Sequence, residues 1–205
     1  MTDVFLAEDD KYLIELRELA PAGFVVALNV NWSGPQILHS EFDPQWRKEY
    51  EDKNYFILDP VFYWTITNRG GIRWSEIKLP DVAKVAHKAS EYGMKYGAVF
   101  SVRESRNRSF LTAARPDREF TEPEMDRLNT IFQHCISTLL PTPNLTDKEL
   151  DTVRSIQSGK TTSEAASDLG ISENDVKSAL ESAMKKLDVK NRPQLIATLV
   201  ARGLV

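Results

Sequence analysis

Asp59 is a carboxylate in an apolar part of the chain, and it is the first candidate for binding chemistry. It follows the apolar and aromatic residues 55–58 and directly precedes Pro60. Burying a carboxylate is costly unless hydrogen-bond donors meet it. Aspartate is a favoured N-cap and proline a favoured first helical residue, so Asp59 is interpreted as capping a helix that begins at Pro60. Under this interpretation the neighbouring aromatic residues are ordinary core.

Three aromatic residues with polar groups accompany Asp59 along the chain: Trp46, Tyr50 and Trp74. Trp46 and Tyr50 are four residues apart, so they share one face of a predicted helix over residues 44–53. The indole N–H and the phenol hydroxyl need partners when buried. These side chains therefore suit either a packed core or the wall of a pocket.

The elements that must position these residues follow from the apolar periodicity. The expected helices cover residues 8–19, 44–53, 60–67, 82–96 and 121–139, and the expected strands cover residues 23–30, 98–103 and 109–114. Gly97 is expected to end the fourth helix, and a turn around Arg106 and Asn107 to join the last two strands. Trp32 follows the first strand and is expected to be ordinary packing. This order predicts an α+β fold, an α-β-α sandwich with an antiparallel sheet.

The domain boundary is predicted at Pro141 and Pro143, because two prolines around one polar residue stop a helix. The helix before them begins with a capping box of Thr121 and Glu124. Cys135 lies in this helix and is expected to be a core residue. The predicted organisation is a sensor domain over residues 1–140, a linker over 141–144 and an all-α domain over 145–205.

Residues 145–205 predict four short helices with explicit starts. Capping boxes open the first three: Thr146 with Glu149, Thr161 with Glu164, and Ser172 with Asp175. The fourth helix is expected over about 192–202. Ala166 lets the second and third helices approach, Gly170 permits a tight turn between them, and Val176 pins the third helix onto the second. This arrangement is typical of a helix-turn-helix, with a generic helical bundle as the alternative.

The third of these helices is the one that reads bases in a helix-turn-helix. Its apolar residues recur at helical steps and must face the domain core: Val176, Leu180, Ala183 and Leu187. The opposite side then carries the predicted DNA-binding residues: Asn174, Lys177, Ser178 and Glu181. Asparagine can pair with adenine, lysine with guanine or phosphate, and glutamate with a cytosine amino group.

Composition excludes several classes of protein. The 205 residues carry a net charge of −4, and residues 144–205 are neutral, with nine basic and nine acidic residues. A DNA-binding role must therefore rest on pattern and not on bulk charge. No apolar run is long enough for a membrane span, the acidic start is no secretory signal, and a single cysteine fits a reducing cytoplasm. The histidines, His39, His87 and His134, are scattered, so neither a catalytic site nor a metal site is expected.

Residues 145–205 resemble the DNA-binding domain of LuxR-type regulators. One collinear series carries the resemblance: Leu145-Thr-Asp-Lys-Glu-Leu, Gly159-Lys-Thr, Glu164-Ala-Ala, Leu169-Gly-Ile-Ser, Val176-Lys and Met184-Lys-Lys-Leu-Asp-Val. Two positions depart from the family pattern. Asp175 stands where the family usually has a phosphate-contacting threonine, and Glu181 stands where its quorum sensors often have arginine. Both changes repel DNA phosphate, whereas Lys177 keeps a basic residue on the exposed side.

The spacing Trp46-x3-Tyr50-x8-Asp59-Pro60-x13-Trp74 resembles the ligand-binding signature of the acyl-homoserine lactone receptors in the same family, and Gly97 matches a further family glycine. The resemblance implies that Trp46 donates to the lactone carbonyl and that Asp59 accepts from the ligand amide. It implies that Tyr50 and Trp74 wall the pocket, and that Thr112 bonds a polar group on the acyl tail.

One departure from the receptor pattern affects a contact with the ligand. Four residues before Trp46, the receptors usually carry a tyrosine that bonds the amide carbonyl, and this chain has Phe42. A buried carbonyl without a donor costs roughly 1–3 kcal/mol. The implied ligand is therefore an unusual acyl-homoserine lactone or a different small molecule.

Together these features predict a regulator that responds to a small signal and binds DNA as a homodimer, with no other cofactor. The alternative is a regulator that acts without a signal, or one that forms heterodimers and antagonises another regulator while binding DNA weakly. Asp175, Glu181 and the neutral second domain favour the alternative.

Overall fold

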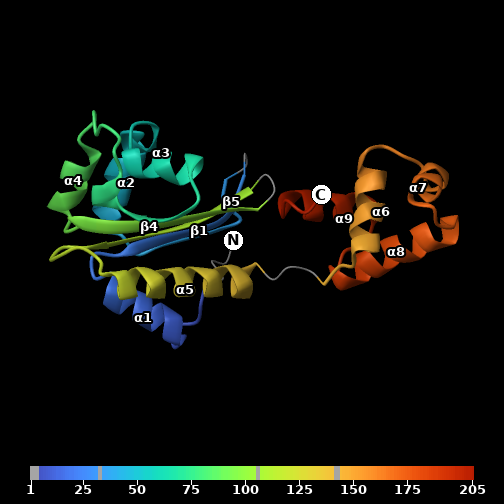
Figure 1. The fold of residues 1–205 in the computed structure, drawn as a ribbon, viewed down its shortest axis with the longest axis horizontal. Helices are drawn as coiled ribbons and strands as arrows, with labels where there is room; N and C mark the ends of the chain where they lie inside the picture. Colours follow the sequence, from blue (N-terminus) through green and yellow to red (C-terminus); the bar gives the residue numbers. More distant parts are fainter. Residues whose placement is uncertain (1–4, 32–33, 105–106, 141–143) are drawn as a thin grey trace. The chain divides into compact units, whose positions relative to one another are not determined.

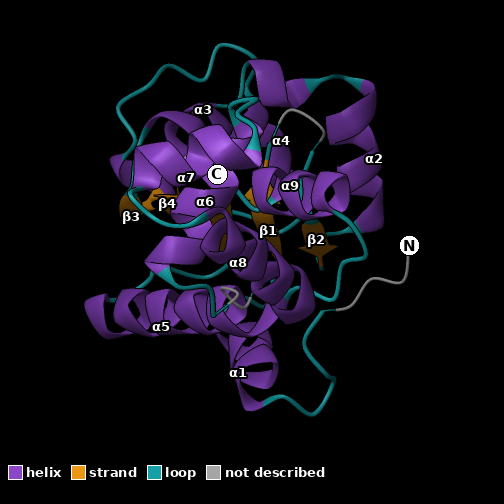
Figure 2. Ribbon diagram, turned by 90° about the vertical axis from the view of Figure 1, so that its right-hand side faces the viewer, coloured by secondary structure: helices purple, strands orange, loops and turns teal. Residues whose placement is uncertain are grey.

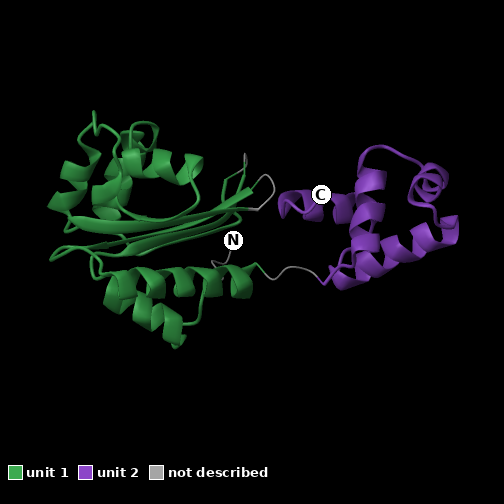
Figure 3. Ribbon diagram, in the orientation of Figure 1, with its two compact units in different colours: residues 1–141 green, residues 142–205 purple. Residues whose placement is uncertain are grey.

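The computed structural model describes residues 5–31, 34–104, 107–140 and 144–205. The chain divides into two compact units, Met1–Pro141 and Thr142–Val205 (Figure 3). Trp32, Arg106 and residues 141–143 of the expected linker lie outside the described residues. None of the helices in the described ranges is long and apolar enough to cross a lipid bilayer.

The first unit is built on a five-stranded antiparallel sheet with the strand order β2-β1-β5-β4-β3. Its strands are β1 (Phe24–Val30), β2 (Ile37–Ser40), β3 (Gly70–Arg73), β4 (Tyr96–Glu104) and β5 (Asn107–Arg115). The longest strands, β4 and β5, form a hairpin in which Val99 pairs with Thr112. β2 and β3 form the edges of the sheet and were not expected from the sequence.

Helices cover both faces of this sheet, which confirms the α-β-α sandwich (Figures 1 and 2). α1 (Lys11–Leu19) and α5 (Glu122–Leu139) lie on one face, and α2 (Pro44–Asp52), α3 (Pro60–Thr67) and α4 (Val85–Glu91) lie on the other. The short helices η1 (Tyr55–Ile57) and η2 (Trp74–Glu76) flank α3 and β3. Cys135 is fully buried in α5, and burial raises the pKa of its thiol to about 12, so it is a core residue as expected.

The expected helix over residues 82–96 is wrong at both ends. α4 spans only Val85–Glu91, and β4 begins at Tyr96, so Gly97 lies inside a strand and does not end a helix. Gly93, with a φ of +82°, turns the chain between the two elements. Tyr96 pairs with Arg115 in the sheet and so does not belong to the helix, whereas the strands expected over residues 98–103 and 109–114 are confirmed as parts of β4 and β5.

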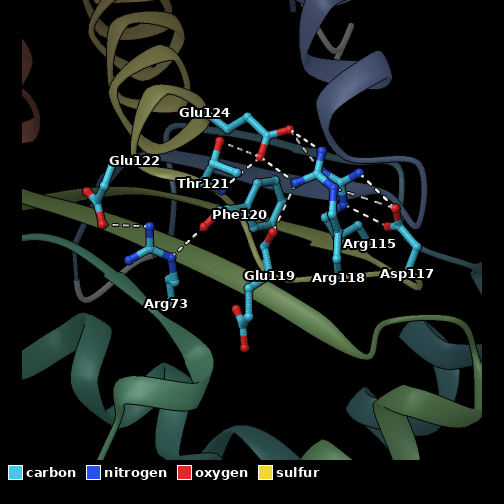
Figure 4. Close-up of polar contacts among 9 residues, drawn as sticks. All are labelled: Arg73, Arg115, Asp117, Arg118, Glu119, Phe120, Thr121, Glu122 and Glu124. Carbon is cyan, nitrogen blue, oxygen red and sulfur yellow. Dashed lines mark hydrogen bonds and ion pairs between the residues drawn. The ribbon is translucent and has the colours of Figure 1, made fainter.

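A network of charged residues fixes the start of α5 (Figure 4). The Glu124 carboxylate accepts from the Thr121 backbone N–H at 2.8 Å, as the predicted capping box requires, and it also accepts from Arg115 and Arg118. The hydrogen bonds from Arg118 hold the pKa of Glu124 well below its usual range. Arg73, at the end of β3, donates to the Phe120 carbonyl at 2.6 Å. The network therefore anchors the strand end that leads directly into Trp74.

The second unit contains α6 (Asp147–Gln157), α7 (Thr162–Leu169), α8 (Glu173–Lys186) and α9 (Arg192–Ala201), as expected. The three predicted capping boxes are present, and Gly170 adopts a φ of +64° at the turn between α7 and α8. Val153, Ala165, Val176, Leu180, Ala183, Leu195 and Leu199 are among the residues that form its core. The helix-turn-helix geometry is therefore confirmed.

Candidate functional site

A cavity of about 470 Å³ lies between the sheet and the layer of α2, α3 and α4. Its lining includes every residue predicted to bind a ligand: Phe42, Trp46, Tyr50, Asp59, Trp74 and Thr112. These residues come from five different elements or loops, so only the folded chain brings them together. The volume and the mainly apolar wall with a few polar groups are typical of a small-molecule site.

Asp59 lines this cavity, and two hydrogen bonds hold its carboxylate in place. One carboxylate oxygen accepts from the Val61 backbone N–H at 2.8 Å, which confirms that Asp59 caps α3. The other accepts from the Tyr50 hydroxyl at 2.7 Å. Burial raises the pKa of Asp59 above its usual value despite these two bonds. The cap leaves room for one more donor, so a ligand contact is compatible with it and stays a prediction.

Trp46 is held by aromatic neighbours that the sequence did not single out. Its ring centroid lies 5.5 Å from that of Tyr92 and 6.0 Å from that of Tyr55. Both tyrosine hydroxyls donate to Glu49, at 3.0 Å from Tyr92 and 3.3 Å from Tyr55. The pairing of Tyr92 with α2 spans 43 residues, and no local pattern indicates it.

The Trp74 ring lies against Gly97, which explains the glycine near the start of β4. A Cβ atom at Gly97 would come within 2.1 Å of Trp74 Cδ2. The indole Nε1 of Trp74 is buried and has no hydrogen-bond partner among the residues that the structure describes. Trp74 lines the cavity, but this donor lies beneath the accessible surface, so the ring must shift for a bound molecule to accept from it.

The remaining predicted pocket residues have contrasting roles. Thr112 donates its hydroxyl proton to the Ala98 carbonyl at 3.2 Å, so its oxygen is left to accept a hydrogen bond. Phe42 is 9% exposed and packs with Trp46 and Met94. Its ring carries no donor, so the cavity lacks a hydroxyl at that point.

The predicted DNA-binding residues Asn174, Lys177, Ser178 and Glu181 are all exposed on α8. Val176, Leu180 and Ala183 are buried on the other side of the same helix, as expected. Asp175 is engaged within the domain: it accepts from Ser172 Oγ at 2.6 Å and from Lys148 Nζ at 2.9 Å. These bonds lower the pKa of Asp175 to about 2, so its charge is partly compensated before any contact with DNA.

Two families match the two units of the chain. Residues 22–139 match the autoinducer binding domain, and residues 143–199 match the bacterial regulatory proteins of the luxR family. The transcriptional activator protein TraR of Rhizobium radiobacter is 29% identical over 232 aligned residues, covering 100% of this chain and 97% of TraR. The regulatory protein SdiA of Escherichia coli (strain K12) is 23% identical over 191 residues, covering 86% of this chain and 80% of SdiA.

Solved structures share the fold. A crystal structure of Escherichia coli SdiA superimposes with a TM-score of 0.62 at 22% identity, over 97% of this chain and 92% of that one. SdiA in complex with octanoyl-rac-glycerol gives a TM-score of 0.61 at 21% identity, over 97% and 90% of the two chains. The chain belongs to the LuxR family of bacterial regulatory proteins, with an autoinducer binding domain followed by a DNA-binding helix-turn-helix.

Proposed function

We propose that the protein regulates transcription as a homodimer on DNA in response to an N-acyl-homoserine lactone or a related acylated signal. The observation that carries the proposal is the cavity between the sheet and α2, α3 and α4, whose mainly apolar wall includes the polar side chains of Trp46, Asp59 and Trp74. The polar groups suit a compact head group, and the apolar lining suits an acyl chain.

Each residue has a role in this proposal. Trp46 donates its indole N–H to the lactone carbonyl, and Asp59 accepts the ligand amide N–H. Tyr50 holds the Asp59 carboxylate in place and, with Trp74, walls the head group. Thr112 accepts from, or bonds through water to, a polar group on the tail. A bound ligand fills the cavity and so stabilises the first unit by mass action.

Titration of the full chain with N-octanoyl-homoserine lactone and with octanoylglycerol tests the ligand class. We expect saturable binding by calorimetry and a higher midpoint of thermal unfolding in the presence of the ligand. Mass spectrometry of small molecules that co-purify from cells grown with candidate signals identifies the natural ligand. Absence of binding by both probes, with no co-purified acyl compound, would contradict the proposal.

The second candidate function is a regulator that works without a signal or that pairs with another regulator and blocks it. The exposed Glu181 favours it, because this carboxylate lies on the side of α8 expected to meet DNA. A gel-shift assay on the upstream region of the protein's own gene separates the two functions. Ligand-dependent retardation supports the proposal, and retardation without ligand, or none, supports the alternative.

Lys177→Ala is expected to weaken DNA binding by roughly 5- to 150-fold if the side chain contacts a base, with relaxed preference at one position per half-site. If Lys177 contacts only phosphate, the loss of affinity will be uniform across DNA sequences and the salt dependence of binding will be shallower.

Glu181→Arg is expected to strengthen non-specific DNA binding by reversing a repulsive charge. Fluorescence anisotropy at several salt concentrations measures both, and unchanged affinity in both variants would show that α8 does not read DNA.

Gly97→Ala is expected to displace the Trp74 ring and to lower the affinity for ligand at least tenfold, because the new Cβ and the ring occupy the same space. Overpacking of this kind typically costs about 1–3 kcal/mol of stability. Gly71→Ala is the matched control, since its Cβ would meet the Phe100 ring at 2.3 Å, away from the cavity lining. Equal loss of ligand affinity in both variants, measured by calorimetry, would refute the specific role of Gly97.

A further inference from the structure

Two polar atoms next to the cavity are buried without a hydrogen-bond partner among the described residues: Trp74 Nε1 and Ser40 Oγ. Both residues line the cavity. Nearly all buried polar atoms in folded proteins have a partner, so each exception calls for an explanation. Ser40 plays no part in the function proposed above, and the spacing of residues in the sequence did not indicate it.

The geometry of β2 places the Ser40 side chain on the cavity side of the sheet. Side chains alternate along a strand, so Leu38 and Ser40 face one way and Ile37 and His39 the other. Leu38 lines the cavity with Ser40, whereas the His39 ring stacks on Phe5 at 4.0 Å between centroids, on the opposite face. Ser40 therefore belongs to the floor of the cavity, with its hydroxyl oxygen just beneath the accessible surface, and a rotation about χ1 brings this oxygen to a bound ligand.

The register of the sheet puts Ser40 in one row with Thr112. Val25 on β1 pairs with Ser40 on one side and with Thr112 on the other. Neighbouring strands are about 4.8 Å apart, so the two hydroxyl-bearing residues lie roughly 10 Å apart across the floor. An extended ligand could contact both residues.

The hydrogen-bonding capacities of the cavity differ from residue to residue. An ionised Asp59 only accepts, the Trp74 indole only donates, and Thr112 has already given its proton to Ala98. Ser40 has no partner in the described part of the chain and can donate. Phe42 follows Ser40 by two residues, also lines the cavity, and has no donor.

We propose that Ser40 is a specificity-determining ligand contact whose hydroxyl donates to the acyl carbonyl oxygen of the signal, in place of the donor that Phe42 lacks. This inference rests on the proposed function, because it names one more contact of the same site. It assigns the ligand an acceptor oxygen near the β2 edge, in addition to the donor that faces Asp59. The Ser40 hydroxyl thereby supplies the hydrogen-bond donor that is missing at Phe42.

A double-mutant cycle on the full chain tests the proposal, with the variants Ser40→Ala, Phe42→Tyr and the two combined. The probes are N-octanoyl-homoserine lactone and its 3-oxo derivative, with affinities measured by calorimetry. Ser40→Ala is expected to weaken both probes by roughly tenfold, the worth of about one hydrogen bond. Phe42→Tyr is expected to improve affinity much more in the Ser40→Ala background than in the parent chain, because the new hydroxyl then replaces a missing donor.

Thermal unfolding of the empty protein separates a ligand contact from a structural role. Because the Ser40 hydroxyl has no partner within the described ranges, Ser40→Ala is expected to leave the unfolding midpoint unchanged or to raise it. Ser109→Ala is the matched control: its buried hydroxyl accepts from the Asn29 N–H at 3.0 Å, so the midpoint of that variant should fall.

Three results would overturn the proposal. Unchanged affinity of Ser40→Ala for both probes would exclude the contact. A loss confined to the 3-oxo probe would assign Ser40 to the tail and not to the acyl carbonyl. A drop in the unfolding midpoint of the empty protein as large as that of Ser109→Ala would assign it a structural role. If the parent chain binds neither probe, the ligand class of the proposed function is wrong. The three results above concern Ser40 alone and require a parent chain that binds, so the two failures can be told apart.

Discussion

Asp59→Asn is expected to lower the affinity for the signal by roughly 10- to 150-fold, since a hydrogen bond to a charged group is worth about 1.5–3 kcal/mol. The asparagine can still cap α3 through its oxygen, but its amide group would also direct N–H donors at Tyr50 or at the ligand amide. The response to the signal should therefore fall while the fold is retained.

Stability of the empty protein provides the internal control for this variant. Burial raises the pKa of Asp59, so at neutral pH the ionised carboxylate destabilises the empty fold, and protonation at lower pH relieves that cost. The asparagine variant lacks this charge, so its unfolding midpoint should be equal to that of the parent chain or higher. A reporter assay across signal concentrations measures the response, and a normal dose response would show that Asp59 is only a helix cap.

Glu149→Ala is expected to destabilise the second unit by roughly 2–4 kcal/mol, because truncating a buried charge leaves its partners unpaired. Glu149 is 5% exposed and accepts from the Thr146 N–H at 2.6 Å, from Ser182 Oγ at 2.6 Å and from Lys186 Nζ at 2.8 Å. It therefore caps α6 and joins it to α8. Loss of this joint should also abolish DNA binding, since α8 would no longer be held in its orientation.

The pH dependence of stability has a definite sign at this residue. Although burial opposes it, the hydrogen bonds from Lys186 and Ser182 lower the pKa of Glu149 to about 2. The stabilisation is therefore fully present above the ordinary glutamate value near pH 4.5 and is lost as the pH falls toward 2. Glu149→Ala should remove this part of the acid sensitivity of the second unit.

Hydrogen exchange of the full chain measures these effects in the second unit separately, since protection of α6 and α8 reports their local stability. Glu164→Ala is the matched control, because Glu164 completes the capping box of α7 through its bonds with Thr161 but is exposed. Its effect should be much smaller. Equal protection of α6 and α8 in the parent chain and in Glu149→Ala would contradict the role of the buried carboxylate.

The sequence predicted well those features that depend on residues three or four positions apart. The capping boxes at Thr121, Thr146, Thr161 and Ser172 are all present, and the apolar stripes of α5 and α8 are buried. A cap or a helix face is formed by neighbours along the chain, so its pattern is visible in a short window. The helix-turn-helix follows from such local signals, together with the turn at Gly170.

Pairing between distant segments was poorly predicted. The edge strands β2 and β3 are four residues each and carry no clear alternation, and α4 is shorter at both ends than the helix expected over residues 82–96. The stability of a strand depends on the partner against which it lies. The hairpin of β4 and β5 was expected because its two strands are neighbours along the chain, whereas the pairings of β2 with β1 and of β3 with β4 were not.

The sequence by itself determined the types and order of the candidate pocket residues, and it indicated that Asp59 needs donors. Only the tertiary structure decided which groups meet: the Tyr50 hydroxyl with Asp59, the Trp74 ring with Gly97, and Ser40 with the cavity floor. The reason is physical. Hydrogen-bond satisfaction and close packing are properties of atoms in space, and the chain segments that supply these atoms are brought together only when the sheet and its helices assemble.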